Sequence, residues 1–182
     1  MRVLADESKV SQLIDDMAAA IAKDMADVGS PNQWALVGVR SRGDDLARRL
    51  AAKLEADRVG TLDITLYRDD LSEIGSQPVV RTTEIPFAID GLHIVLIDDV
   101  LMTGRSTRAA MDSLMDLGRP RRIWLSVLVD RGGRELPIAP DHVGLDLSDQ
   151  PTEGELVEVH LAPTDERDEV IVRPVEHEVE AS

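Results

Sequence analysis

HIVLIDDVLMTGRST, residues 93–107, is the stretch that decides the fold of this chain. Its four apolar residues Ile94–Ile97 predict a buried strand. Two adjacent acids, Asp98 and Asp99, follow at the end of that strand, and a Thr103-Gly104 turn comes just beyond them. The spacing from Thr107 to Leu117 then predicts a helix. The stretch therefore predicts a strand, a turn and a helix, with two mutually repelling carboxylates beside the turn.

Strands and helices alternate along much of the chain. Hydrophobic periodicity predicts the helices Asp6–Asp27 and Arg42–Ala56 and the strands Trp34–Val39, Leu62–Tyr67 and Arg122–Val129. This alternation predicts an α/β fold with a mostly parallel, twisted sheet flanked by helices. Two later segments, Val157–Leu161 and Glu169–Arg173, are expected as edge strands. The irregular segment 67–85 is typical of a lid or binding loop, and the acidic end, 174–182, is expected to fray.

Length and composition predict a single domain, 1–182, because 182 residues with 43% hydrophobic content close one substantial core. The chain shows no cysteine, no apolar signal segment and no membrane-spanning stretch, so we expect a cytoplasmic protein without a membrane partner. The net charge is -15, of which residues 153–182 contribute -8 through 10 acidic and 2 basic residues. This charge excludes a large uniform basic face for nucleic acid. Local anion sites are still compatible with this net charge, because 17 of the 20 basic residues are arginine, whose guanidinium group suits phosphate.

The turn after the two acids has the features of a phosphate site. In an open α/β sheet, ligands bind beyond the carboxyl ends of the strands, where a helix amino terminus offers free N–H groups. The predicted phosphate-binding residues are Thr103, Gly104, Arg105, Ser106 and Thr107. Beside them, Asp98 and Asp99 suit the vicinal hydroxyls of a ribose. The Walker A and dinucleotide glycine patterns are absent, and for the acid pair alone a solvated strand end or a magnesium site of another fold stays an alternative.

With its Thr-Gly turn, this stretch resembles the phosphoribosyl diphosphate (PRPP) motif of type I phosphoribosyltransferases. Longer segments resemble the PyrR family of pyrimidine operon attenuators and uracil phosphoribosyltransferases: LVGVRSRG (36–43), VGTLDITLYRDDL (59–71), DVLMTGR (99–105), DLGRP (116–120) and VLVDRGGRELPI (127–138). The resemblance runs from about residue 10 to residue 172. It implies the type I phosphoribosyltransferase fold and the synthesis of UMP and pyrophosphate from uracil and PRPP. It also implies Mg²⁺, held through PRPP and water with Asp98 or Asp99, and a homodimer that pairs into a tetramer in some relatives.

The same resemblance implies roles for individual residues. Arg40, Ser41, Arg42 and Gly43 would form the pyrophosphate loop, and Tyr67–Asp70 would belong to a hood loop, at about 67–85, from which Arg68 reaches the diphosphate. Val129, Asp130 and Arg131 would hold the base, partly through main-chain groups, with Asp130 supporting the turn. The residues assigned to catalysis are Arg40, Arg42, Arg68, Asp98 and Asp99. For the arginines, a solvated surface position is the alternative.

Met102 is a departure from related enzymes. It stands where purine phosphoribosyltransferases typically carry an aspartate and where the PyrR family usually carries a tyrosine. A thioether cannot manage a proton on a purine ring, so purine salvage is disfavoured. The four histidines, His93, His142, His160 and His177, are predicted to be structural or exposed.

The family resemblance further implies binding of pyrimidine operon mRNA when UMP or UTP fills the site. Charge argues against this role, because Gly133, Ala139 and Leu145 stand where relatives often carry histidine, arginine and lysine. The remaining candidates for RNA contacts are Lys23, Ser41 and Arg134. An alternative function is a UMP- or UTP-sensing RNA-binding attenuator with little or no catalytic turnover.

Overall fold

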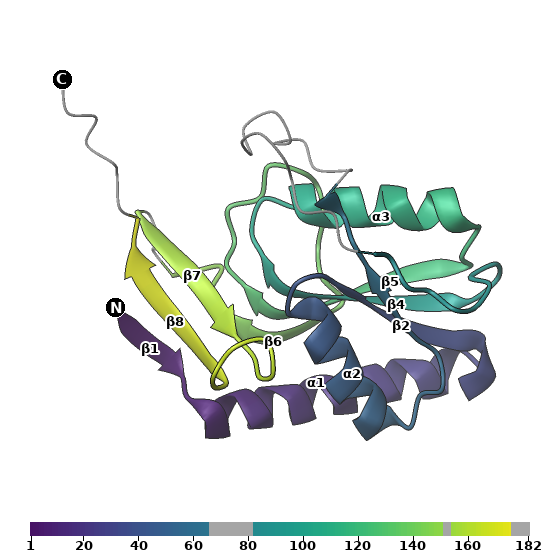
Figure 1. The fold of residues 1–182 in the computed structure, drawn as a ribbon, viewed down its shortest axis with the longest axis horizontal. Coiled ribbons are helices and arrows are strands. Elements are labelled where there is room, and N and C mark those ends of the chain that lie inside the picture. Colours follow the sequence, from purple (N-terminus) through teal and green to yellow (C-terminus); the bar gives the residue numbers. More distant parts are fainter. Residues whose placement is uncertain (66–81, 151–153, 176–182) are drawn as a thin grey trace.

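The computed structural model describes residues 1–65, 82–150 and 154–175. Its main sheet has five parallel strands in the order β3-β2-β4-β5-β6 (Figure 1). These strands are β2 (Trp34–Val39), β3 (Val59–Leu62), β4 (His93–Leu101), β5 (Arg122–Asp130) and β6 (His142–Asp146). Because the strands are parallel, their carboxyl ends meet at one edge of the sheet, which is the edge predicted to bind ligand.

Helices cover both faces of the main sheet. α1 (Glu7–Val28) and α2 (Gly43–Leu54) lie on one face, and α3 (Arg105–Leu117) lies on the other (Figure 1). Side chains of β4 alternate between these two layers: Val95 and Ile97 pack in the α1/α2 core, whereas Ile94 and Leu96 pack in the α3 core. A short 3-10 turn, η1 (Pro31–Gln33), connects α1 to β2. This architecture confirms the predicted α/β class.

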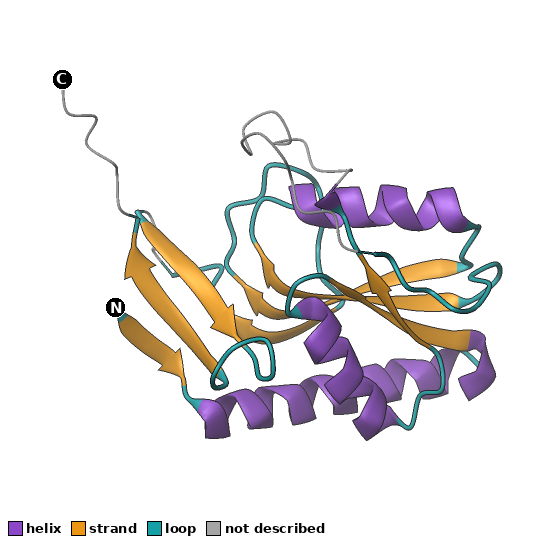
Figure 2. Ribbon diagram, in the orientation of Figure 1, coloured by secondary structure: helices purple, strands orange, loops and turns teal. Residues whose placement is uncertain are grey.

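A second, antiparallel sheet lies beside the main one (Figure 2). It contains β1 (Arg2–Ala5), β7 (Glu155–His160) and β8 (Glu169–Pro174) in the order β1-β8-β7. The two late strands expected from the sequence are therefore present, but they do not extend the main sheet, and β8 is the central strand of its own sheet.

Several predicted boundaries need correction. The strand predicted at Leu62–Tyr67 lies earlier, at Val59–Leu62, and residues 66–81, with most of the predicted hood loop, fall outside the described residues. β4 runs on to Leu101, so the acid pair lies inside the strand. α3 begins two residues earlier than predicted, at Arg105. The strands β1 and β6 were not predicted. Within the described ranges, no helix is both long and apolar enough to cross a membrane.

Candidate active site

The acid pair of β4 lies near the carboxyl edge of the main sheet. Asp98 is 7% exposed, and its carboxylate accepts a hydrogen bond of 3.0 Å from the Asp99 amide. The Asp99 carboxylate accepts one of 2.8 Å from the Val100 amide. Burial, and then repulsion from Asp99, raises the pKa of Asp98 well above its usual range, and burial also raises the pKa of Asp99. A ligand that offers hydroxyl donors or positive charge would relieve this repulsion.

The turn between β4 and α3 is built for a close approach of the backbone. Gly104 has φ of 90°, and a Cβ atom there would come within 3.3 Å of Ile138 Cδ1. The Thr103 hydroxyl accepts a hydrogen bond of 3.3 Å from the Arg105 amide at the start of α3. Ser106 and Arg105 are exposed, and Arg105 pairs with Glu135 at 2.6 Å, whereas Thr107 is buried. The structure therefore places the predicted phosphate residues at a helix amino terminus, with the Thr107 side chain turned into the core.

The loop after β5 packs against this turn. The Asp130 carboxylate accepts hydrogen bonds from the Gly132 amide at 2.9 Å and from Arg134 Nη2 at 2.6 Å, which confirms the predicted support of the turn. Arg134 also donates to the Met102 carbonyl at 2.8 Å and to the Ile138 carbonyl at 3.0 Å. The Thr103 carbonyl accepts from the amides of Glu135 and Leu136. The predicted base loop and phosphate turn are thus braced into one unit, with Arg134, assigned above to RNA, as the main brace.

Arg131 connects this unit to the second sheet. Its Nη1 atom donates to the Met102 thioether sulfur at 2.8 Å, and its Nη2 atom donates to the carbonyl of Glu155 at the start of β7. The Arg131 amide is bonded to the Leu101 carbonyl at 2.9 Å. Met102, which is 40% exposed, is therefore in contact with a predicted base-binding side chain.

The predicted pyrophosphate loop lies directly against the acid pair. A Cβ atom on Gly43 would come within 2.7 Å of the Ile97 carbonyl and 3.2 Å of the Asp98 Cα atom, so only glycine permits this packing. Ser41 is half-buried, and Arg40 lies 3.9 Å from Asp44 and 3.7 Å from Glu84. The buried Arg40 Nε atom has no hydrogen-bond partner among the described residues. The Arg40 guanidinium therefore lies between the carboxylates of Asp44 and Glu84.

Arg42 points to a partner that the sequence did not reveal. Its guanidinium forms two hydrogen bonds with the Asp165 carboxylate, of 2.8 and 2.9 Å, and these bonds raise the pKa of Arg42. Asp165 belongs to the loop between β7 and β8, in the segment APTDERDE (162–169). In the sequence, that acidic run reads as solvated surface, and no periodicity links it to Arg42.

The remaining predicted residues comprise Val129, the segment Tyr67–Asp70 and Lys23. Val129 pairs with Val100 and Leu145 inside the sheet. Arg68 and the rest of Tyr67–Asp70 lie outside the described residues. Lys23 is exposed on α1, on a face of the main sheet rather than at its carboxyl edge.

The described histidines are structural, as predicted. His93 stacks on Trp34 with ring centroids 4.8 Å apart, and burial lowers its pKa. His142 lies between the Ser126 hydroxyl and the Asp24 carboxylate, and His160 bonds to Glu169. His177 lies outside the described residues.

The oxygen donors at the carboxyl edge fit a magnesium ion that is bound largely by its substrate. Among the described residues, no group of three or more His, Asp or Glu side chains is arranged to hold a metal ion. Asp98 and Asp99 supply two carboxylates, and Mg²⁺ in phosphate-transferring sites is bound by one or two carboxylates together with substrate oxygens and water. The residues present therefore fit the metal expected from the sequence.

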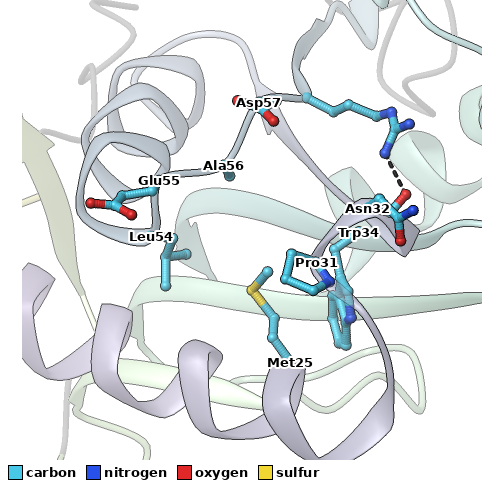
Figure 3. A pocket seen from close by; sticks show the side chains of 9 residues that line it. Met25, Pro31, Asn32, Trp34, Leu54, Glu55, Ala56 and Asp57 are labelled. Atoms are coloured by element: carbon cyan, nitrogen blue, oxygen red, sulfur yellow. Dashed lines mark hydrogen bonds between the residues drawn. The ribbon is translucent and has the colours of Figure 1, made fainter.

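A separate cavity of about 290 Å³ opens at the opposite, amino-terminal end of the main sheet (Figure 3). Met25, Pro31, Trp34 and Leu54 form its apolar part, and Glu55 and Asp57 lie at its polar side. It contains none of the predicted site residues. The residues predicted to bind phosphate, ribose and base instead lie at the carboxyl edge.

Comparisons with known proteins identify the family of this chain. A family model described as "Phosphoribosyl transferase domain" matches residues 4–163. The Bifunctional protein PyrR of Thermus aquaticus is 57% identical over 142 residues, which are 75% of this chain and 77% of that protein. The Bifunctional protein PyrR of Elusimicrobium minutum is 46% identical over 174 residues, which are 93% of this chain and 94% of that protein.

A solved structure shows the same fold at much lower identity. The hypoxanthine phosphoribosyltransferase of Trypanosoma cruzi is 20% identical, covers 96% of this chain and 97% of its own, and has a TM-score of 0.69. At that identity the likeness concerns the fold, whereas the family follows from the curated relatives and the domain match. The chain belongs to the PyrR family of phosphoribosyl transferase domain proteins.

Proposed function

We propose that this protein is a uracil phosphoribosyltransferase, which makes UMP and pyrophosphate from uracil and PRPP. The observation that carries the proposal is the buried acid pair, Asp98 and Asp99, beside a turn that opens the amino terminus of α3. Two carboxylates with raised pKa values suit a ribose with vicinal hydroxyls, and a helix amino terminus suits its 5'-phosphate. Family membership supports the same reaction.

Each part of the substrate has a proposed position. The 5'-phosphate lies on the turn Thr103–Thr107, the ribose hydroxyls on the acid pair, and the diphosphate near Arg40–Gly43. Uracil lies at Val129–Arg131, where main-chain donors and acceptors match its O2, N3–H and O4 edge. Mg²⁺ bound through PRPP oxygens and water would neutralise charge on the diphosphate.

The proposed reaction is a displacement at C1' of PRPP. Uracil N1 forms a bond to C1' as the bond from C1' to the pyrophosphate oxygen breaks, and the N1 proton is released. Because positive charge develops on the ribose, the carboxylates and fixed dipoles of the site stabilise the transition state. The braced loops contribute by holding base and ribose in reacting geometry. The proton from uracil N1 passes to water, and pyrophosphate leaves with Mg²⁺.

The first experiment follows UMP formation from PRPP, magnesium and labelled uracil. The variant Asp98→Asn/Asp99→Asn should lose product formation, whereas Asp112→Asn, which alters an exposed pair with Arg108 on α3, should retain it. Binding of UMP without product from the wild type would contradict the enzyme and support the sensing alternative. Product from the double variant at the wild-type rate would contradict the assigned site.

The second proposed function is regulation of a pyrimidine operon by uridine-nucleotide-dependent mRNA binding. The relatives' name, Bifunctional protein PyrR, supports it. The partners are then PRPP, uracil, pyrophosphate, UMP or UTP and the operon mRNA, in a cytoplasmic homodimer or tetramer. A gel shift of pyrimidine leader RNA at low salt, with and without UMP, tests this function. Absence of any shift would remove it while leaving the enzyme unaffected.

A further inference from the structure

The loop between β7 and β8, residues 161–168, is fastened at three points to α2 and to the residue just before it. Asp165 pairs with Arg42, which is the residue just before α2. The Thr164 hydroxyl donates to the Asp45 carboxylate at 2.6 Å, and Asp168 pairs with Arg49. The second sheet is therefore attached to the helix that begins at the proposed pyrophosphate loop.

Both residues of the Arg42–Asp165 pair are held in place by further contacts or by burial. Asp165 Oδ2 also accepts the Leu161 amide at 2.7 Å, which fixes the carboxylate to its own loop. Side-chain exposure is 32% for Arg42 and 18% for Asp165, so neither group moves freely in solvent. The Arg42 backbone has φ of 73°, a left-handed conformation that residues other than glycine adopt only when their surroundings hold them there.

Arg42 also lies close to the acid pair. A cavity of about 270 Å³ between the main and second sheets is lined by Arg42, Asp99, Glu158 and His160. The Arg42 charge opposes the rise in the pKa of Asp99. The position of the Arg42 guanidinium therefore affects both the loop that would bind diphosphate and a carboxylate that would bind ribose.

We propose that Asp165 is a positioning residue, which holds Arg42 and the backbone of residues 40–43 in the geometry that binds the diphosphate of PRPP. This inference rests on the proposed function, because it assigns the diphosphate to that loop. The bidentate pair uses Nε and Nη2 of Arg42, so the proposal assigns the contact with the diphosphate to Nη1. Asp165 thus acts through Arg42 and does not itself touch the substrate.

The Arg49–Asp168 pair provides a matched control. It is also a two-bonded arginine–carboxylate pair between α2 and the same loop, and Asp168 likewise accepts a main-chain amide, that of Ala162. Arg49, however, lies inside α2, six residues beyond Gly43, and donates its hydrogen bonds within the described residues to Asp168 and the Ala162 carbonyl. A purely structural fastening predicts similar effects from both pairs, whereas a positioning role predicts a difference.

The test compares Asp165→Asn with Asp168→Asn in the full chain. We expect the KM for PRPP to rise at least about fivefold in Asp165→Asn, the size of a weakened charge-assisted hydrogen bond, with kcat at saturating PRPP little changed. Asp168→Asn should keep the wild-type KM while losing a similar amount of thermal stability. Asp165→Glu should recover part of the affinity. Equal KM values in the two asparagine variants, or tighter PRPP binding in Asp165→Asn, would overturn the proposal.

A direct measurement of PRPP binding distinguishes a failure of this inference from a failure of the proposed function. Calorimetry with magnesium and PRPP, without uracil, reports the diphosphate loop even if no UMP is formed. Asp165→Asn should weaken this binding, and adding the change to Arg42→Ala should have no further effect. Additive losses would mean that Asp165 does not act through Arg42. If Asp165→Asn fails to fold, Asp165→Glu takes its place in both measurements.

Discussion

Asp98 is a residue whose ionisation opposes folding. Its pKa is raised because the carboxyl group is buried and then because Asp99 carries like charge. A folded-state pKa above the unfolded value means that the folded chain binds more protons, so stability falls as pH rises from about 4 through the raised pKa. Ribose hydroxyls or a cation bound beside Asp98 would therefore favour its ionised form.

Replacing Asp98 should raise the stability of the protein and lower its activity. Asp98→Asn keeps the shape and the acceptor for the Asp99 amide. We expect its melting temperature at pH 7 to exceed that of the wild type by about 2–4 °C, since an amide has no ionisation cost on burial. UMP formation should fall at least about tenfold. Melting curves from pH 4 to 8 check the sign, and a variant that melts below the wild type throughout would contradict it.

Gly43 supports a second prediction at the residue scale. In an exposed helix alanine is favoured over glycine by about 1 kcal/mol, but a Cβ atom here would meet the Ile97 carbonyl at 2.7 Å. We expect Gly43→Ala to cost about 1–3 kcal/mol of unfolding free energy and to raise the KM for PRPP. Urea titration and PRPP kinetics measure the two effects.

Gly29→Ala is the control for this substitution, because its Cβ atom would meet only the movable end of the Gln33 side chain. It should change neither quantity appreciably. An equal loss in both variants would show that the contact of Gly43 with β4 has no special role.

Local patterns in the sequence predicted features whose contacts lie within one short segment. Gly104 lies at the predicted turn before α3 and Asp130 supports its own turn, whereas Asp98 and Asp99 lie inside β4 rather than just after it. The partner of Arg42 was not predictable, because Asp165 lies 123 residues away and side-chain pairing at that separation leaves no periodic signal. The contacts of Arg134 with Asp130 and with the Met102 and Ile138 carbonyls were not predictable either, since a sequence does not show which donors are used inside the fold.

At the scale of elements, the buried strands and long helices were predicted, whereas β1 and β6 were missed and β3 was placed too late. β3 contains Gly60, which the sequence reads as a poor strand residue, yet a Cβ atom there would meet Ile85 Cγ1 at 2.9 Å. β6 contains Gly144, where a Cβ atom would meet the Leu128 carbonyl at 2.8 Å and the Met17 sulfur at 3.1 Å. Tertiary packing demanded small residues in these strands and overrode local β-propensity.

The fastening of loop 161–168 to α2 should weaken in acid. Hydrogen bonds from Arg42 and from Arg49 lower the pKa of Asp165 and of Asp168, respectively. A lowered folded-state pKa contributes stability that is present above the unfolded value, about 3.9, and is lost as pH falls through the folded value. We expect wild-type melting temperature to drop below pH 4, and Asp165→Asn/Asp168→Asn to show a smaller drop from a lower starting value.

The double variant's melting curves between pH 2.5 and 6 measure this effect. Asp112→Asn is the control, because it removes an exposed carboxylate from α3 and leaves the loop intact. An acid transition of equal size in the wild type and the double variant would show that other carboxylates govern acid unfolding.

At the scale of the whole molecule, the second sheet closes one side of the site through side chains rather than strand pairing. Arg131 reaches from the base loop to β7, and Asp165 reaches from the β7–β8 loop to Arg42. Both contacts cross between the two sheets at the carboxyl edge of the main one. The proposed substrate contacts are therefore coupled to the relative position of the sheets, a coupling that the late edge strands expected from the sequence did not reveal.

The net charge of the whole molecule affects how many phosphate contacts it can make with RNA. The chain carries -15, and Arg134, one of three candidate RNA contacts, already donates to Asp130 and to the carbonyls of Met102 and Ile138. Lys23 is exposed and Ser41 is half-buried. A complex with pyrimidine leader RNA should therefore rest on few phosphate contacts, each of which contributes a slope of about -0.7 to log affinity against log salt for a single strand.

We expect a slope of about -2 or shallower for the leader RNA in the presence of UMP, measured by gel shift over a series of salt concentrations. Lys23→Ala should make the slope shallower, because it removes one phosphate contact, while UMP synthesis should continue at the wild-type rate, since Lys23 lies away from the carboxyl edge of the main sheet. An RNA of the same composition in scrambled order should bind more weakly at every salt concentration. A slope steeper than about -4 would require a basic surface that the charge distribution of this chain argues against.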